Sequence, residues 1–101
     1  GTRLAALGHQ SLWLWELPSG RPLAHHPSRK FYTGLAFSPN GEFLATSNND
    51  GVVRFWDGRT GEPVKEFSWL INKVLCVAFS PDGTRAAAGG EFGSIVVWDI
   101  D

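Results

Sequence analysis

Histidine, cysteine and carboxylate side chains are the groups in this sequence that could bind a metal ion or take part in catalysis. The histidines are His9, His25 and His26. Adjacent residues of a strand point to opposite faces, so His25 and His26 cannot easily bind one metal ion together. We therefore expect all three histidines to lie on the surface or in loops, and we expect no metal site.

The single cysteine, Cys76, offers a thiol for nucleophilic chemistry. It lies in an apolar run at residues 74–77 with no neighbouring base in the sequence, which favours a small buried side chain. The glycine-rich run at residues 89–93 resembles a phosphate loop only superficially, because it lacks the Lys-Ser/Thr end and no helix follows. We interpret this run as a hairpin turn.

Carboxylates supply the remaining candidates for acid–base chemistry. Most of them fall in predicted turns, namely Asp50, Asp57, Asp82 and Asp99. No pair stands out for acid and base roles. We predict that the chain is not an enzyme, has no catalytic residue and binds no cofactor.

Composition narrows the classes of partner. The 101 residues carry a formal net charge of −1, and the nine Lys and Arg are scattered between Arg3 and Arg85, which argues against nucleic acid. No apolar stretch approaches the roughly 20 residues that a membrane helix needs, so we expect no membrane partner. One cysteine cannot form an intrachain disulfide, which favours a reducing compartment, and we expect a cytoplasmic protein.

An internal repeat of about 42 residues organises the chain. The Ser-Pro-Asn-Gly sequence at residues 38–41 recurs as Ser-Pro-Asp-Gly at residues 80–83. A tryptophan followed by an acidic residue recurs in the same phase, at Trp15, Trp56 and Trp98. Markers that keep one phase indicate a repeat architecture.

Short strands separated by turn residues fill each period. In the middle period we predict strands at residues 32–38, 43–47, 52–56 and 62–67. Pro39 and Asn40 favour a tight turn in which Gly41 is left-handed, and the Asn-Asp-Gly sequence at residues 49–51 favours a second hairpin. Four antiparallel strands per period, without helical periodicity, predict an all-β chain of small four-stranded sheets.

These motifs resemble those of the WD-repeat family. The resemblance implies blades of a β-propeller, each with strands a to d counted outward from the central channel. It divides the chain into a partial blade with strands b, c and d at residues 1–27, a complete blade at residues 28–68, and a partial blade with strands a, b and c at residues 69–101. We expect a partial propeller, the C-terminal part of a larger one.

The resemblance also implies a buried hydrogen-bonded set in each blade, made of Trp, Ser or Thr, Asp and His. The middle blade has Trp56, Thr46 and Asp50, with Ser28 at the His position, which predicts a weaker or water-bridged network. The first blade has Trp15, Ala5 and His9 at such positions. The last blade has Trp98, Ala88, Phe92 and Leu70, which predicts apolar packing instead.

Tryptophans outside that set are harder to assign. The three blade-closing tryptophans are expected in the core, whereas Trp13 and Trp69 could pack between blades or form exposed anchors.

In WD-repeat proteins, partners often bind the face formed by the loops before strand a and the turns between strands b and c. The positions on that face are Phe31, Thr33, Asn49, Lys73, Leu75 and Glu91.

The function implied by the resemblance is a non-enzymatic scaffold for protein–protein interactions. Phe31 is the most informative of these positions: it is either an interface anchor, because large aromatic residues dominate interface energies, or a loop residue packed against a neighbouring blade. Two alternatives stay open. Propellers avoid free sheet edges by closing the ring, so further copies of this chain, or the remaining blades of a longer protein, could complete it. The segment could also be a regulatory or sensor module of a larger signalling enzyme.

Overall fold

The computed structural model describes residues 2–68 and 73–100. Its strands follow one another with short turns between them, and a single turn of 3-10 helix, η1 (Glu91–Gly93), joins the last two. The strands are β1 (Thr2–Leu7), β2 (Ser11–Leu17), β3 (Pro22–Pro27), β4 (Tyr32–Phe37), β5 (Phe43–Asn48), β6 (Val52–Asp57), β7 (Pro63–Ser68), β8 (Val74–Phe79), β9 (Arg85–Gly90) and β10 (Ile95–Asp99).

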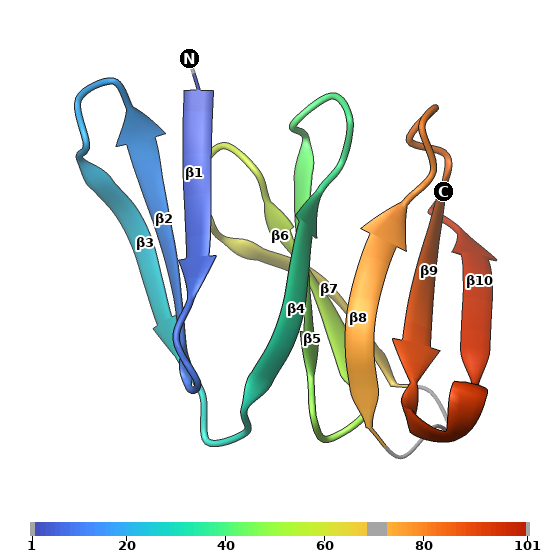
Figure 1. The fold of residues 1–101 in the computed structure, drawn as a ribbon. Helices are drawn as coiled ribbons and strands as arrows, with labels where there is room; N and C mark the ends of the chain where they lie inside the picture. Colours follow the sequence, from blue (N-terminus) through green and yellow to red (C-terminus); the bar gives the residue numbers. More distant parts are fainter. Residues whose placement is uncertain (1, 69–72, 101) are drawn as a thin grey trace.

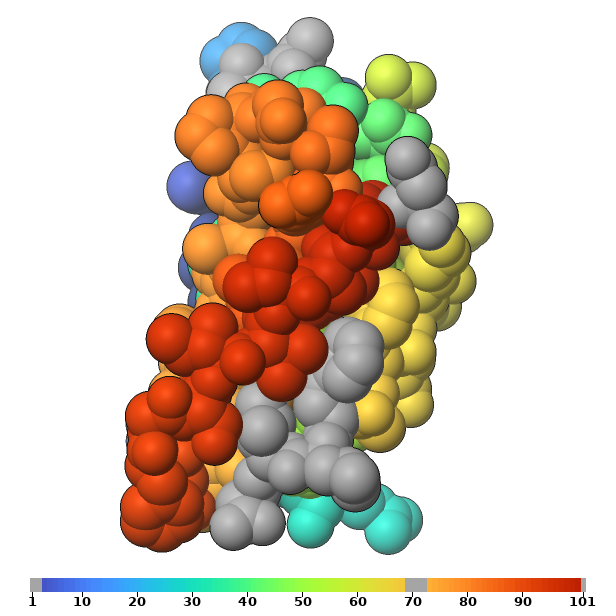
Figure 2. Space-filling model, turned by 90° about the vertical axis from the view of Figure 1, so that its right-hand side faces the viewer, coloured from blue at the N-terminus to red at the C-terminus, as the bar shows by residue number. Residues whose placement is uncertain are grey.

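Three antiparallel sheets stand side by side (Figure 1). The first has the order β1-β2-β3, the middle sheet β4-β5-β6-β7, and the last β8-β9-β10. The predicted all-β architecture is confirmed, and the predicted strands of the middle period match the observed ones to within about one residue at most ends. The last sheet forms most of the right-hand face of the molecule, with β7 visible beside it (Figure 2).

The repeated hairpin sequences fold alike. Gly41 and Gly83 adopt φ of 73° and 74°, a conformation that glycine accepts without steric cost. In the β4–β5 hairpin, the Ser38 hydroxyl donates to the side-chain oxygen of Asn40 at 2.8 Å. In the β8–β9 hairpin, the Ser80 hydroxyl donates to the Asp82 carboxylate at 2.7 Å. The turns predicted at both positions are confirmed.

The Asp82 hairpin is expected to lose stability in acid, whereas the Asn40 hairpin is not. Hydrogen bonds from the Ser80 hydroxyl and then from the backbone and hydroxyl of Thr84 lower the pKa of Asp82 to about 2. Because folding lowers this pKa, the ionised carboxylate stabilises the folded state at pH values above its ordinary pKa of 3.8. This stabilisation is lost as the pH falls towards 2. Melting temperatures recorded across this range should fall less for Asp82→Asn than for the unmodified chain.

The matched control for this titration is Asn40→Asp, which places a carboxylate in the same turn of the other hairpin. The Ser38 hydroxyl and the Glu42 backbone N–H would donate to the new carboxylate, but the Glu42 side chain, which accepts from the Asn40 amide at 3.2 Å, would repel it, so its acid-sensitive contribution should be smaller than that of Asp82. Parallel melting profiles for the unmodified chain and both variants would show that these turn hydrogen bonds do not contribute to stability.

The inner strands of the middle sheet bury side chains on both faces, since successive strand residues point to opposite sides. Towards the first sheet, a cluster of buried side chains contains Leu12, Tyr32, Leu44 and Trp56. Towards the last sheet, a second cluster contains Ala45, Val53, Phe55, Val74, Val77, Ala86, Ala88 and Ile100. The neighbours Leu44 and Ala45, each 0% exposed, thus belong to different interfaces.

Phe55 lies at the centre of the second cluster. It is 1% exposed, and its ring centroid lies 5.2 Å from that of Phe67, 5.4 Å from that of Phe79 and 5.7 Å from that of Phe43. Trp98 joins the group, with centroids 5.3 Å from Phe67 and 6.3 Å from Phe55. This aromatic cluster joins the middle sheet to the last.

The first blade-closing tryptophan is not in the core, contrary to expectation. Leu12 and Leu14 of β2 are buried towards the middle sheet, so the alternating Trp13 and Trp15 point to the opposite face and are only half-buried. Trp13 stacks on Trp15 with centroids 5.9 Å apart and on His25 at 3.9 Å. Trp69 and Leu70 lie outside the described residues.

Two further expectations for the last sheet are wrong. Cys76 is exposed, because β8 pairs only with β9 among the described strands and the residue beside the thiol, Gly89, has no side chain to cover it. Phe92 is 86% exposed rather than packed, since the η1 turn holds it at φ 64° with its side chain outward. Ala88, in contrast, is buried as expected. The hairpin turn predicted over residues 89–93 is confirmed.

Candidate partner-binding surface

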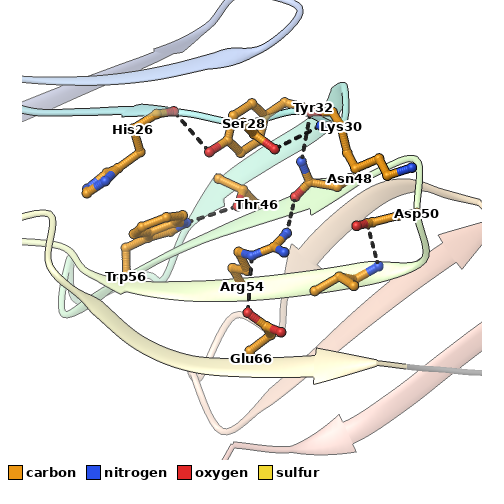
Figure 3. Close-up of polar contacts among 11 residues, drawn as sticks. His26, Ser28, Lys30, Tyr32, Thr46, Asn48, Asp50, Arg54, Trp56 and Glu66 are labelled. Carbon is orange, nitrogen blue, oxygen red and sulfur yellow. Dashed lines mark hydrogen bonds and ion pairs between the residues drawn. The ribbon is translucent and has the colours of Figure 1, made fainter.

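A buried hydrogen bond joins the two central strands of the middle sheet. The Trp56 indole Nε1 donates to the Thr46 hydroxyl at 2.9 Å, and the two residues are 6% and 0% exposed (Figure 3). Asp50 lies apart from this pair, at the exposed β5–β6 turn, where its carboxylate accepts the Val52 backbone N–H at 3.2 Å. The Ser28 hydroxyl accepts the Lys30 N–H at 3.1 Å. The four positions therefore contribute one buried pair and two turn contacts.

Thr46→Val is expected to lower the free energy of unfolding by about 1–3 kcal/mol, because it keeps the shape of the side chain but leaves the buried Trp56 N–H without its acceptor. Chemical denaturation followed by circular dichroism measures the loss. In a double-mutant cycle with Trp56→Phe, the double variant should lose less than the two single variants combined. Additive losses would contradict a contribution from this hydrogen bond.

A second polar network, which the sequence did not reveal, extends from the same sheet. The Arg54 Nη1 donates to the side-chain oxygen of Asn48 at 2.8 Å, and its Nε lies 3.3 Å from the Glu66 carboxylate. Asn48 is 0% exposed and its amide also donates to the Lys30 carbonyl at 3.5 Å (Figure 3). Burial raises the pKa of Tyr32, and the positive charge of Arg54 opposes that rise. The sequence pattern gave no reason to single out Arg54. Its place in this network is evident only from its contacts in the structure.

His26 lies at the interface of the first and middle sheets, which corrects the expectation of a surface or loop residue. Its ring stacks on Trp56 with centroids 4.3 Å apart. Its Nε2 lies 2.6 Å from the Gly61 carbonyl, and since a carbonyl only accepts, Nε2 carries the hydrogen. His9 and His25 are exposed, as predicted.

The loop between β3 and β4 has its backbone fixed at each position from 28 to 32. On the side of the first sheet, the Ser28 N–H donates to the Gln10 carbonyl and the Gln10 side chain to the Arg29 carbonyl, each at 2.9 Å. The Tyr32 N–H donates to the His9 carbonyl at 2.8 Å. These bonds hold the loop to the β1–β2 turn.

On the other side, the same loop is held to the β5–β6 turn. The Asn49 N–H donates to the Phe31 carbonyl at 3.0 Å, beside the bond from Asn48 to Lys30. The side chains of Arg29, Lys30 and Phe31 nevertheless all project outward, and Phe31 is 49% exposed. A fixed backbone with outward side chains presents these residues in a preformed arrangement.

We call this end of the molecule the lower rim, defined by His9, Arg29, Lys30, Phe31, Asn49, Lys73 and Glu91. It lies at the lower end in Figure 1. The His9 and Phe31 rings lie 5.6 Å apart, which places the first turn beside the β3–β4 loop. The Glu91 N–H donates to the Lys73 carbonyl at 3.1 Å, which repeats the contact between Asn49 and Phe31 in the last sheet.

The other predicted partner-binding residues occupy different surroundings. Thr33 faces inward, because its hydroxyl donates to the Val74 carbonyl at 2.5 Å and lies 2.8 Å from the Ser47 hydroxyl. Leu75 is 48% exposed on β8. The Asn49 side-chain oxygen is buried and accepts no hydrogen bond from the described residues. Phe31, Asn49, Lys73 and Glu91 thus come together at the lower rim, whereas Thr33 serves as a link between sheets.

No three His, Cys, Asp or Glu side chains gather within the described part of the chain in a way that could hold a metal ion. A hollow of about 600 Å³ at the opposite end is lined by the β4–β5 hairpin, Arg3 and Arg59. Within residues 2–68 and 73–100, no helix is long and apolar enough to cross a membrane.

Comparison with known proteins gives the chain its family. A family model described as "WD domain, G-beta repeat" matches residues 19–57 and 61–99. Each match contains the outermost strand of one sheet and the first three strands of the next. Its two copies together cover more than half of the chain.

Individual relatives show the same likeness. An uncharacterized WD repeat-containing protein of Schizosaccharomyces pombe is 35% identical over 74% of the chain, and actin-interacting protein 1 of Caenorhabditis elegans is 37% identical over 75%. The target of rapamycin complex subunit LST8 of Bos taurus is 25% identical over 98%. The chain spans 19%, 13% and 32% of the lengths of these relatives. The chain belongs to the WD-repeat family, and its three sheets are blades of a partial β-propeller.

Proposed function

We propose that the chain is part of a non-enzymatic scaffold and holds a protein partner at the lower rim. The observation that carries this proposal is the presentation of Phe31: a half-exposed aromatic side chain on a loop whose backbone is fixed by both neighbouring turns. A preformed loop loses little conformational entropy when a partner binds, so more of the contact energy becomes affinity.

The names of the relatives support this class of function. One is called actin-interacting protein 1 and another a subunit of the target of rapamycin complex. Incubation with a panel of hydrolase substrates should show no turnover.

Phe31→Ala is expected to weaken partner binding more than about tenfold while the fold is kept, because an interface anchor contributes roughly 2 kcal/mol or more. The unmodified chain and the variant would be immobilised, and proteins from cells of the source organism that remain bound would be quantified by mass spectrometry. Val64→Ala is the matched control, since Val64 is 46% exposed on β7, away from the lower rim.

Proteins that are retained by the unmodified chain and by Val64→Ala, but not by Phe31→Ala, are the expected result. Equal retention by all three would remove Phe31 from the binding surface. If the unmodified chain retains no protein above a blank support, the scaffold proposal is wrong.

A further inference from the structure

We infer that the partner segment recognised at the lower rim is acidic and carries a bulky apolar side chain. This inference rests on the proposed function and specifies its ligand. It depends on three exposed cationic side chains, Arg29, Lys30 and Lys73, which lie on the lower rim together with Phe31.

These cations are not neutralised within the described part of the chain. Arg29, Lys30 and Lys73 are exposed, and none forms an ion pair or a side-chain hydrogen bond with a described residue. Elsewhere, arginines do have carboxylate partners, as in the pairs Arg21–Glu16, Arg54–Glu66 and Arg85–Asp99. The lower rim therefore keeps positive charge available for a partner.

Hydrogen bonds place the three cations along the same rim. Lys30 and Phe31 are adjacent in the fixed β3–β4 loop, and Asn48 and Asn49 hold their carbonyls. The hydrogen bond from Thr33 to the Val74 carbonyl joins the start of β4 to the start of β8. Lys73 directly precedes β8 and therefore lies at the same end of the molecule as Lys30. Positive charge thus extends from the middle sheet to the last.

One carboxylate of the lower rim, that of Glu91, and one beside the rim, that of Asp50, limit where an acidic segment can lie. Glu91 is adjacent to Lys73, to whose carbonyl its backbone N–H donates. Asp50 lies at the β5–β6 turn, where its carboxylate accepts the Val52 N–H. The cationic pair Arg29 and Lys30 is therefore the most favourable position for acidic groups, and Phe31 beside it offers the apolar contact. Attraction at such exposed sites is weakened by salt.

The test uses defined fluorescent peptides and the whole chain. The first peptide contains glutamate, aspartate and leucine, the second replaces the acidic residues with lysine, and the third keeps the acidic residues but replaces leucine with serine. Fluorescence anisotropy at low and high salt gives the dissociation constants. We expect only the first peptide to bind well, with affinity that falls as salt rises.

Two variants test the residues, and both change exposed side chains that form no hydrogen bond or ion pair with a described residue. Lys30→Glu should weaken binding of the first peptide more than about tenfold, as charge reversal replaces attraction with repulsion. Lys65→Glu makes the same change on the outer strand β7 and should leave binding unchanged. Equal loss in the two variants would show only a general effect of net charge and would overturn the inference.

The outcomes separate this inference from the proposed function. If the leucine-containing acidic and basic peptides bind equally and Phe31→Ala weakens both, the rim is a protein-binding surface but the acidic specificity is wrong. If phosphatidylserine vesicles or single-stranded DNA bind more tightly than the first peptide, and Lys30→Glu abolishes that binding, the cations serve a different class of partner and the inference is overturned. If Phe31→Ala affects neither peptide nor protein binding, both proposals fail.

Discussion

Phe55→Ala should lower the free energy of unfolding by about 3–5 kcal/mol, the range found when a buried phenylalanine is truncated to alanine. The ring is 1% exposed and contacts aromatic side chains of β5, β7, β8 and β10. Its removal leaves a cavity where two sheets meet, and strands fixed by hydrogen bonds can close such a cavity only in part. Urea denaturation followed by circular dichroism measures the change.

Phe31→Ala is the matched control, because it deletes the same atoms from a side chain that is 49% exposed. It should cost less than about 1 kcal/mol, as is usual for surface substitutions that leave caps and turns intact. Similar losses for the two variants would mean that the contact between the middle and last sheets contributes little to the stability of the chain.

Gly58→Ala should lower the free energy of unfolding by about 3 kcal/mol, although it adds only a methyl group. A Cβ atom at this position would lie 2.1 Å from the Gly41 carbonyl oxygen and 3.1 Å from the Glu42 carbonyl carbon. Both are backbone atoms, so no flexible side chain can move aside. The Gly58 N–H also donates to the Glu42 carbonyl at 2.8 Å, and displacement would weaken this bond.

Gly8→Ala provides the comparison for thermal unfolding. A Cβ atom there would meet only the Ser11 Cβ at 4.0 Å, which is ordinary contact, and φ does not lie in the left-handed region. Its melting temperature should stay close to that of the unmodified chain, whereas that of Gly58→Ala should drop by several degrees. A Gly58→Ala variant that melts like Gly8→Ala would show that the β4–β5 hairpin can shift away at little cost.

The repeats allowed the fold to be predicted from the sequence, because each marker has a local cause. Pro39 and Gly41 define a turn by their own backbone preferences, and this turn recurs with Gly83 in the last sheet. Burial was harder to predict, since it depends on what covers each face. Trp15 and Trp56 occupy the same place in the repeat, but Trp56 packs against a neighbouring sheet in this chain and Trp15 does not.

The candidate site was predicted only in part. Phe31, Asn49, Lys73 and Glu91 were placed on one face by the family resemblance, and the structure brings them to the lower rim. Thr33 was predicted on the same face, and its hydroxyl donates to the Val74 carbonyl of the next sheet, a contact that leaves no local signal in the sequence. Arg29 and Lys30 were not predicted as site residues, because the basic residues were regarded as scattered along the chain. Two adjacent cations directly before Phe31 could have indicated a binding surface.

The family repeat and the folded sheet are out of step by one strand. A repeat such as residues 19–57 contains β3 of the first sheet and β4, β5 and β6 of the middle one. No single repeat can therefore fold into a complete sheet, and each needs the first strand of the following repeat to finish it. Tandem gene duplication of such a unit adds one complete sheet for each new copy and reproduces the same unfinished ends.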